Sequence, residues 1–128
     1  MVESKTVYEL ISALEVSFED ILTVLKAMGN SKRLAILVVL LTGEKNFTDL
    51  KKETTLKKTA LSNHLTKLVH AGLILKPDHN KYQLTPDGEL FIRTLETTYK
   101  KSEMRGKKGT EVIQRRQFSE SFVESFFG

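Results

Sequence analysis

The sequence has no cysteine among its 128 residues. Disulfide bonds, thiolate metal sites, cysteine nucleophiles and thiol-based redox sensing are therefore excluded. No apolar run reaches the roughly 18 to 20 residues that cross a bilayer, because the longest is LAILVVLL at 34–41. The N-terminus has no basic stretch followed by an apolar one, so it does not look like a secretion signal. We expect a cytoplasmic protein that makes no membrane contact.

The motifs of common enzyme classes are missing as well. There is no glycine-rich phosphate loop, no Ser-x-x-Lys pair and no metal-binding His-Glu pair. The gap between His64 and His70 does not place both on one face of a helix, as two metal ligands would need. We therefore expect no enzyme activity, no metal site and no cofactor.

Charge is spread unevenly along the chain, although the net charge is only +4. Residues 1–30 carry a net charge of −3, residues 51–67 carry +4 and residues 99–128 carry +3. A basic middle behind an acidic front is typical of a surface that binds a polyanion. A solvated, lysine-rich surface explains the same charges equally well.

The first segment carries an apolar heptad repeat, in which hydrophobic residues recur at spacings of four and three. We call these residues the apolar seam: Val7, Ile11, Leu14, Phe18, Ile21, Leu25 and Met28. Ser17 and Asp20 stand at capping-box spacing and could begin a second helix. We favour two helices or one kinked helix, with residues 1–17 as an N-terminal helix. The seam faces the chain's own core or a second copy, so its first three residues are candidates for a dimer interface.

A helix, a turn and a second helix are predicted next. Gly29 can end the first segment in a left-handed conformation, and Asn30 can cap the largely apolar helix that follows. Asn46 and Asp49 have capping-box spacing at the start of a short helix. A tight turn then leads to a helix over residues 57–71, an order typical of a helix-turn-helix.

A β-hairpin is predicted over residues 73–85, where branched and aromatic residues flank the turn formers Pro77 and Asn80. Thr85 and Pro86 provide the cap and first position of another helix, which runs to about residue 100. A helix-turn-helix followed by a hairpin is a winged helix. The predicted fold is therefore mainly α with a small β-hairpin wing and extra helices at both ends.

The C-terminal part is divided into a basic linker, residues 100–109, and an amphipathic helix, residues 110–128. Phe118, Phe122 and Phe126 recur every four residues in that helix. A helix this apolar on one face must cover something, so these three residues are the second candidate for a dimer interface.

The helix over residues 57–71 has two unlike faces. Leu61, Leu65 and Leu68 share one face, whereas Ser62 and Asn63 lie on the other with several lysines and threonines. Lysine, asparagine and hydroxyl side chains are those that reach phosphates and base edges in the DNA major groove. An ordinary amphipathic helix with a solvated side is the alternative reading of this pattern.

Three stretches resemble the ArsR-like winged-helix regulators, and the likeness extends over roughly residues 18–99. They are MGNSKRLAILVVLL (28–41), LSNHLTKLVHAGLI (61–74) and YQLTPDG (82–88). The resemblance implies a homodimeric regulator of transcription, in most members a repressor, with double-stranded DNA as its partner. The chain departs from the metal-sensing members because it has no cysteine and no pair of histidines at ligand spacing.

We predict a DNA-binding surface on the second helix of the helix-turn-helix, the helix before it and the wing. Its members are Lys51, Lys52, Lys57, Lys58, Thr59, Ser62, Asn63, His64, Lys67, Lys76, His79, Asn80 and Lys81. For His64, a structural role in its helix is the alternative to a phosphate contact. A winged helix that binds proteins without specific DNA binding is the alternative, favoured by the apolar end segments. The operator, the sign of regulation and any small-molecule or protein effector stay open.

Overall fold

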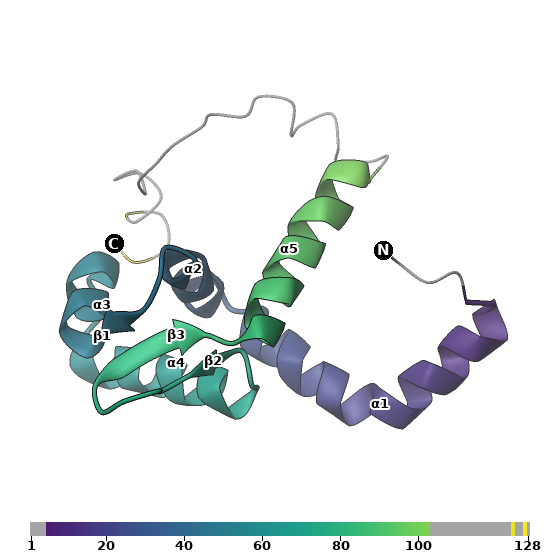
Figure 1. Ribbon diagram of the computed structural model, residues 1–128, viewed down its shortest axis with the longest axis horizontal. Coiled ribbons are helices and arrows are strands. Elements are labelled where there is room, and N and C mark those ends of the chain that lie inside the picture. The colour runs from purple at the N-terminus through teal and green to yellow at the C-terminus, as the bar shows by residue number, and fades with distance from the viewer. Residues whose placement is uncertain (1–4, 103–123, 125–126, 128) are drawn as a thin grey trace.

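Five helices and three short strands follow one another along residues 5–102 of the computed structural model (Figure 1). The structure describes these residues together with Glu124 and Phe127. In chain order the elements are α1 (Val7–Met28), α2 (Ser31–Leu40), β1 (Lys45–Asn46), α3 (Phe47–Thr54), α4 (Lys58–His70), β2 (Ile74–Leu75), β3 (Lys81–Leu84) and α5 (Pro86–Lys101). The mainly α winged helix-turn-helix predicted from the sequence is confirmed.

α1 is a single helix that runs through the expected boundary at residue 17. Thr6 is its N-cap, because the Thr6 side chain accepts a hydrogen bond from the Glu9 amide at 3.2 Å. The predicted helix start at Ser17 is therefore wrong, since an isolated Ser-x-x-Asp spacing does not interrupt a helix whose apolar residues continue on both sides. Figure 1 shows α1 bent near its middle, as the kinked form of the prediction requires.

The junction between α1 and α2 differs from the prediction at one residue. Gly29 has a φ of −77°, so it does not adopt the left-handed conformation that we expected. Its amide still bonds the Leu25 carbonyl at 2.8 Å and ends the helix. The extended backbone of Asn30 follows at once, and its side chain accepts from the Arg33 amide at 3.0 Å. The predicted Asn30 cap is confirmed, and the chain enters α2 without a left-handed residue.

The hydrophobic core lies between the C-terminal end of α1, α2, α3, α4 and the base of the wing. Its most deeply buried side chains are Ile36, Leu37, Leu40, Leu50, Leu61, Leu65, Leu68, Leu73 and Ile74. Phe127 joins this core with only 4% of its surface exposed. Its carbonyl accepts a hydrogen bond at 2.9 Å from Thr55, which ends α3 at a φ of 59°. The predicted helix over residues 110–128, with Phe118, Phe122 and Phe126, otherwise lies outside the described residues, as does the linker beyond residue 102.

The wing is a three-stranded antiparallel sheet in the order β1-β3-β2. β2 and β3 form the predicted hairpin, with Ile74 opposite Leu84. β1 was not predicted: Lys45 lies opposite Tyr82 and attaches the residues before α3 to the wing. Because of this strand, the wing is fixed to the helix-turn-helix along one edge.

α5 starts at a crowded junction with the wing. Thr85 is its N-cap and accepts from the Gly88 amide at 2.9 Å, with Pro86 at the first position, as predicted. The Thr85 hydroxyl also donates to the Gly72 carbonyl at 2.7 Å. A Cβ at Gly88 would lie 2.1 Å from the Leu73 carbonyl oxygen, so only glycine fits there. α5 is thus held closely against the wing at its first turn.

Candidate nucleic-acid interface

α4 presents one apolar face to the core and one polar face to solvent. Leu61, Leu65 and Leu68 are buried on the inner side. These three anchors fix the rotation of the helix about its axis. The polar residues that they turn outward are all exposed: Lys58, Thr59, Ser62, Asn63, Thr66 and Lys67.

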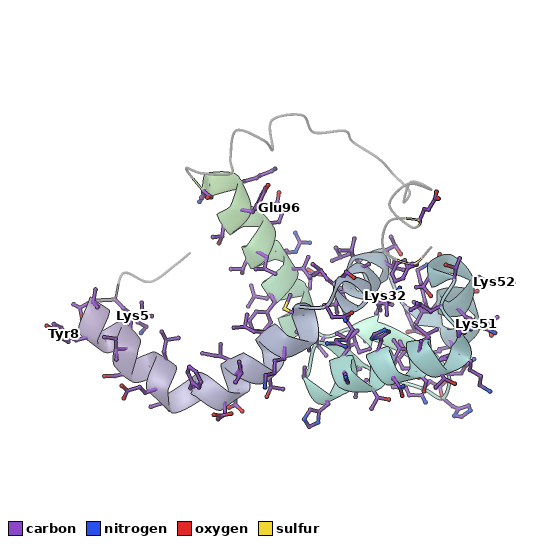
Figure 2. All side chains as sticks on the ribbon, turned by 180° about the vertical axis from the view of Figure 1, so that it is seen from behind. Lys5, Tyr8, Lys32, Lys51, Lys52 and Glu96 are labelled. Carbon is purple, nitrogen blue, oxygen red and sulfur yellow. The ribbon has the colours of Figure 1, made fainter. Side chains whose placement is uncertain are left out.

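The N-terminus of α4 has no side-chain cap. Lys57 occupies the cap position and makes no side-chain hydrogen bond to the helix. The first amide groups of α4 therefore remain available to an anion, which the positive end of the helix dipole also attracts. Lys51 and Lys52 are exposed in the last turn of α3, close to this end of α4, and Figure 2 labels both.

The wing carries the remaining predicted residues. His79 and Asn80 are exposed at its tip, and the exposed Lys76 lies 5.5 Å from the centre of the Tyr82 ring. Lys81 is also exposed, but its amine lies 3.6 Å from a carboxylate oxygen of Glu44. Glu44 thus partly offsets the charge of Lys81, a pairing across 37 positions of sequence that no local pattern reveals.

His64 occupies a different place from the other predicted residues of α4. It is half-buried, and its Nδ1 lies 3.4 Å from Nη1 of Arg33. Because a guanidinium only donates, Nδ1 must be the acceptor. Burial lowers the pKa of His64 below the usual histidine value, and the positive charges of Arg33, Lys32 and Lys67 lower it further. A neutral imidazole facing Arg33 is the arrangement that this pKa shift favours.

Two basic residues at the start of α2 adjoin α4 and were not predicted for the site. Lys32 and Arg33 both act electrostatically on His64, so their charges lie near the middle of α4. Lys32 is labelled in Figure 2, on the same side of the view as α4. In the sequence, Arg33 was visible only as part of a family pattern, and nothing indicated that its partner would be 31 residues away.

A second surface of the molecule is apolar. Val7, Ile11 and Leu14 are 70%, 47% and 42% exposed, so the N-terminal part of the apolar seam does not enter the chain's own core. On α5 the exposed large apolar residues are Leu90, Phe91, Leu95 and Tyr99. Figure 1 shows α1 and α5 extending away from the rest of the described chain.

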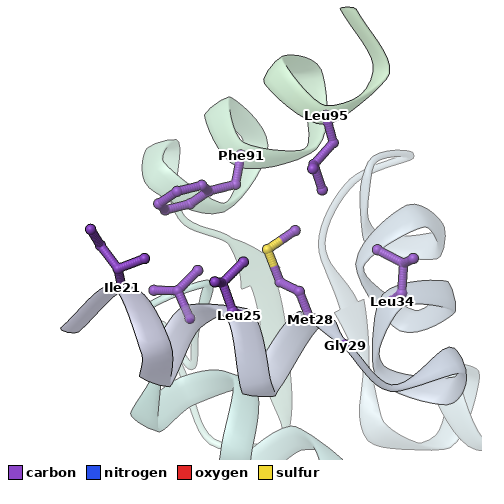
Figure 3. A pocket seen from close by; sticks show the side chains of 8 residues that line it. Ile21, Leu25, Met28, Gly29, Leu34, Phe91 and Leu95 are labelled. Carbon is purple, nitrogen blue, oxygen red and sulfur yellow. The ribbon is translucent and has the colours of Figure 1, made fainter. Parts of the chain in front are cut away.

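A pocket of about 280 Å³ opens where α1, α2 and α5 meet (Figure 3). In Figure 3, Leu25 and Met28 of α1 face Phe91 and Leu95 of α5 across it, with Leu34 of α2 at one side. No charged side chain lines the pocket among the residues that the structure describes. The surface formed by α1 and α5 is therefore both exposed and hollowed.

In the part of the chain that the structure describes, no group of three or more His, Cys, Asp or Glu residues could hold a metal ion. Within the same residues, no helix has the length and apolar character needed to cross a membrane.

Comparisons with known proteins agree with this architecture. The model of the arsR family of bacterial regulatory proteins matches residues 30–76, which include α2, α3 and α4. Reduced HlyU from Vibrio cholerae N16961 is 32% identical, with a TM-score of 0.57 over 68% of this chain and 96% of that one. The transcriptional regulator HlyU from Vibrio vulnificus CMCP6 is 29% identical, with a TM-score of 0.56 over 70% and 97% of the chains. None of the curated proteins matches significantly.

The fold, the outward polar face of α4 and these comparisons define a DNA-binding transcriptional regulator of the winged helix-turn-helix class. Such proteins regulate and do not catalyse, in agreement with the sequence prediction. More particularly, the chain belongs to the arsR family of bacterial regulatory proteins.

Proposed function

We propose that this protein is a homodimeric repressor that reads the DNA major groove with the polar face of α4. The exposure of that face, opposite three buried leucines, is the observation that carries the proposal. Ser62 and Asn63 are the residues suited to base edges, since asparagine pairs with adenine in two hydrogen bonds. Lys58 and Lys67 reach either guanine or phosphate from the same face.

Backbone contacts come from both ends of this face. Lys51, Lys52 and Lys57 contact phosphate near the N-terminus of α4, where the uncapped amides add their own attraction. The wing, residues 73–85, lies along the backbone through Lys76, His79 and Asn80. Because Glu44 offsets part of its charge, Lys81 contributes less than Lys76.

The apolar surface of α1 and α5 supports the proposed dimer. Large apolar side chains that stay exposed side by side mark a contact surface, and the seam on α1 repeats as in helices that pair. Two copies related by a two-fold axis would place their α4 helices in successive major grooves, about 34–36 Å apart. We propose that this dimer works in the cytoplasm, beside the chromosome.

The proposal also covers the sign of regulation and the kind of signal. Most ArsR-like regulators repress, so we expect expression of the bound genes to rise when the protein is deleted. The chain has no cysteine, so its signal does not pass through a thiol. An apolar effector or a partner protein agrees with the pocket between α1 and α5.

Sequencing of the DNA fragments that the protein retains would identify the operator. Operator affinity should then be compared with that of a triple variant, Lys58→Ala, Ser62→Ala and Asn63→Ala. The variant should bind the operator at least about a hundredfold more weakly, because each base contact contributes about 1–3 kcal/mol. The matched control, Arg93→Ala, Thr97→Ala and Lys100→Ala on exposed positions of α5, removes more charge and should bind normally. Normal operator binding by the α4 variant would refute this reading face.

A winged helix that binds proteins is the second candidate, and the exposed apolar surface of α1 and α5 favours it. The discriminating measurement is a gel shift with the DNA upstream of the protein's own gene at low salt. A retarded band that weakens steeply with salt supports the repressor, because lysines on phosphate release counterions. Absence of any band supports the protein-binding module.

A further inference from the structure

Three helices meet at the side chain of Arg33. Its Nε donates to the Ala27 carbonyl at 2.8 Å, and its Nη2 donates to the Lys26 carbonyl at 3.0 Å. Both carbonyls belong to the last turn of α1, where a positive charge also meets the negative end of the helix dipole. Arg33 itself stands in the first turn of α2. Its guanidinium therefore closes the end of α1 from the neighbouring helix.

The third contact reaches α4. Nη1 of Arg33 faces Nδ1 of His64 at 3.4 Å, on a residue that lies between the exposed Asn63 and the buried Leu65. The guanidinium is planar and its N–H groups point in fixed directions. Two contacts to α1 therefore fix the direction of the third. A shift of α1 relative to α2 changes where His64 can sit.

We propose that Arg33 is a positioning residue for DNA reading, because it couples the placement of α1 to the orientation of α4 through His64. The inference rests on the proposed function, in which α4 reads DNA and α1 belongs to the dimer surface. Arg33 itself need not touch DNA, since three of its N–H groups are already directed at protein acceptors. Through this contact, the packing of two copies of α1 would set how each Asn63 meets its base pair.

Salt dependence separates this role from a direct phosphate contact. A lost phosphate contact weakens operator and random DNA alike and lowers the salt slope by about one. A lost positioning contact weakens the operator only and leaves the salt slope unchanged. It also broadens the preference for one half-site spacing, because α4 is no longer held at a fixed angle to the dimer axis.

The experiment measures operator and random-sequence DNA binding over a series of salt concentrations and half-site spacings. Arg33→Gln should weaken operator binding about tenfold or more, since one misplaced base contact suffices for that, and random DNA should bind as before. Arg33→Lys should bind the operator as weakly as Arg33→Gln does, because an ammonium keeps the charge but lacks the planar arrangement of N–H groups. Arg93→Gln, which removes an exposed arginine paired with Glu89 on α5, is the matched control and should bind normally.

His64 provides an independent variant that leaves the end of α1 capped. His64→Leu removes the acceptor for Nη1 while both bonds from Arg33 to α1 remain possible. It should broaden the spacing preference as Arg33→Gln does, and the double variant should be no worse than either single variant. Thermal unfolding of each variant first establishes whether it is folded. If Arg33→Gln is not folded, His64→Leu alone tests the inference.

Three results would overturn the inference. Full restoration by Arg33→Lys would show that charge alone matters, and a lower salt slope would show that Arg33 binds phosphate. An unchanged spacing preference with additive losses for Arg33 and His64 would show that the two residues act separately. If the unaltered protein prefers no DNA sequence at all, the proposed function fails, a result that is distinguishable from all three.

Discussion

The body of the protein and its two long helices contrast in how they treat apolar residues. In the body, made of α2, α3, α4 and the wing, most large apolar side chains pack against one another, and residues such as Ile36 and Leu37 are fully buried. On α1 and α5, side chains of the same chemistry lie in solvent, as Leu14 and Leu90 do. The body, together with the last residues of α1, thus has a closed core within one chain, whereas most of α1 and α5 leaves an apolar surface exposed to solvent.

The exposed surfaces of the two regions also differ in their chemistry. The exposed groups on α4 and the wing are lysines, hydroxyls and amides, which water solvates well and which a nucleic acid can bind. Between α1 and α5 the exposed lining is apolar and encloses about 280 Å³. Phosphate oxygens can replace the water around the polar surface, whereas any partner that covered the apolar surface would release the water in contact with it.

The largest difference between the regions should appear in two leucine deletions. Leu61→Ala in α4 leaves a cavity among fully buried neighbours and should lower the free energy of unfolding by about 2–5 kcal/mol. Leu90→Ala on α5, where the side chain is 62% exposed, should lower it by less than about 1 kcal/mol. Urea unfolding at two protein concentrations checks this. Equal losses of unfolding free energy in the two variants would contradict the division between a body with a closed core and an exposed apolar surface on α1 and α5.

The next effect concerns dimerisation through the exposed apolar surface of α1. Ile11→Glu places a charge in the apolar seam of each copy and should raise the dimer dissociation constant at least about a hundredfold, or about 2.7 kcal/mol. Ser12→Glu, one residue away and outside the seam, is the control and should dimerise normally. Sedimentation velocity measures both, with circular dichroism to verify the helices. A dimer that survives Ile11→Glu places the interface elsewhere.

A smaller effect is expected where the two regions join. Gly88→Ala would bring a Cβ to 2.1 Å from the Leu73 carbonyl oxygen, so the start of α5 or the base of the wing must move. The free energy of unfolding should fall by about 1–3 kcal/mol, as in other overpacked positions. Thr94→Ala, at an exposed position of the same helix, should change it by less than about 0.5 kcal/mol. A fully stable Gly88→Ala protein would mean that α5 can leave the wing freely.

The smallest effect is the response of stability to pH at His64. Burial, aided by Arg33, Lys32 and Lys67, holds the pKa of His64 below its value in the unfolded chain, about 6.5. Between these two pKa values the unfolded chain binds more protons, so stability rises with pH and falls on acidification below about 6.5. Acidification from pH 7 should therefore destabilise the unaltered protein more than His64→Leu. An NMR titration of the His64 ring gives the sign directly, and a pKa above 6.5 would contradict it.

Local chemistry was enough to predict most of the fold. Asn30, Asn46 and Thr85 each cap the helix that follows, as expected from side chains that bond an amide three residues ahead. The inner face of α4 was equally predictable, because Leu61, Leu65 and Leu68 follow the helical period. These features depend on neighbours in sequence and need no knowledge of the rest of the chain.

The features that escaped prediction depend on distant partners. β1 has only two residues and no periodicity, and it is a strand because Lys45 meets Tyr82. The Glu44–Lys81 pair and the Arg33–His64 contact join residues that no local spacing relates. Polarity identified the outward face of α4, but the inward turn of His64 required the packing of α2 against α4.

The hydroxyl oxygen of Thr85, at the base of the wing, connects three elements of the fold. The Thr85 hydroxyl donates to Gly72, just beyond α4, and accepts from Gly88 in α5. Thr85 thus helps to set the angle between the wing and α4, although it lies away from the DNA-binding face. A relative with the same lysines and asparagines but another residue at this position would hold its wing at another angle and fit DNA of a different shape.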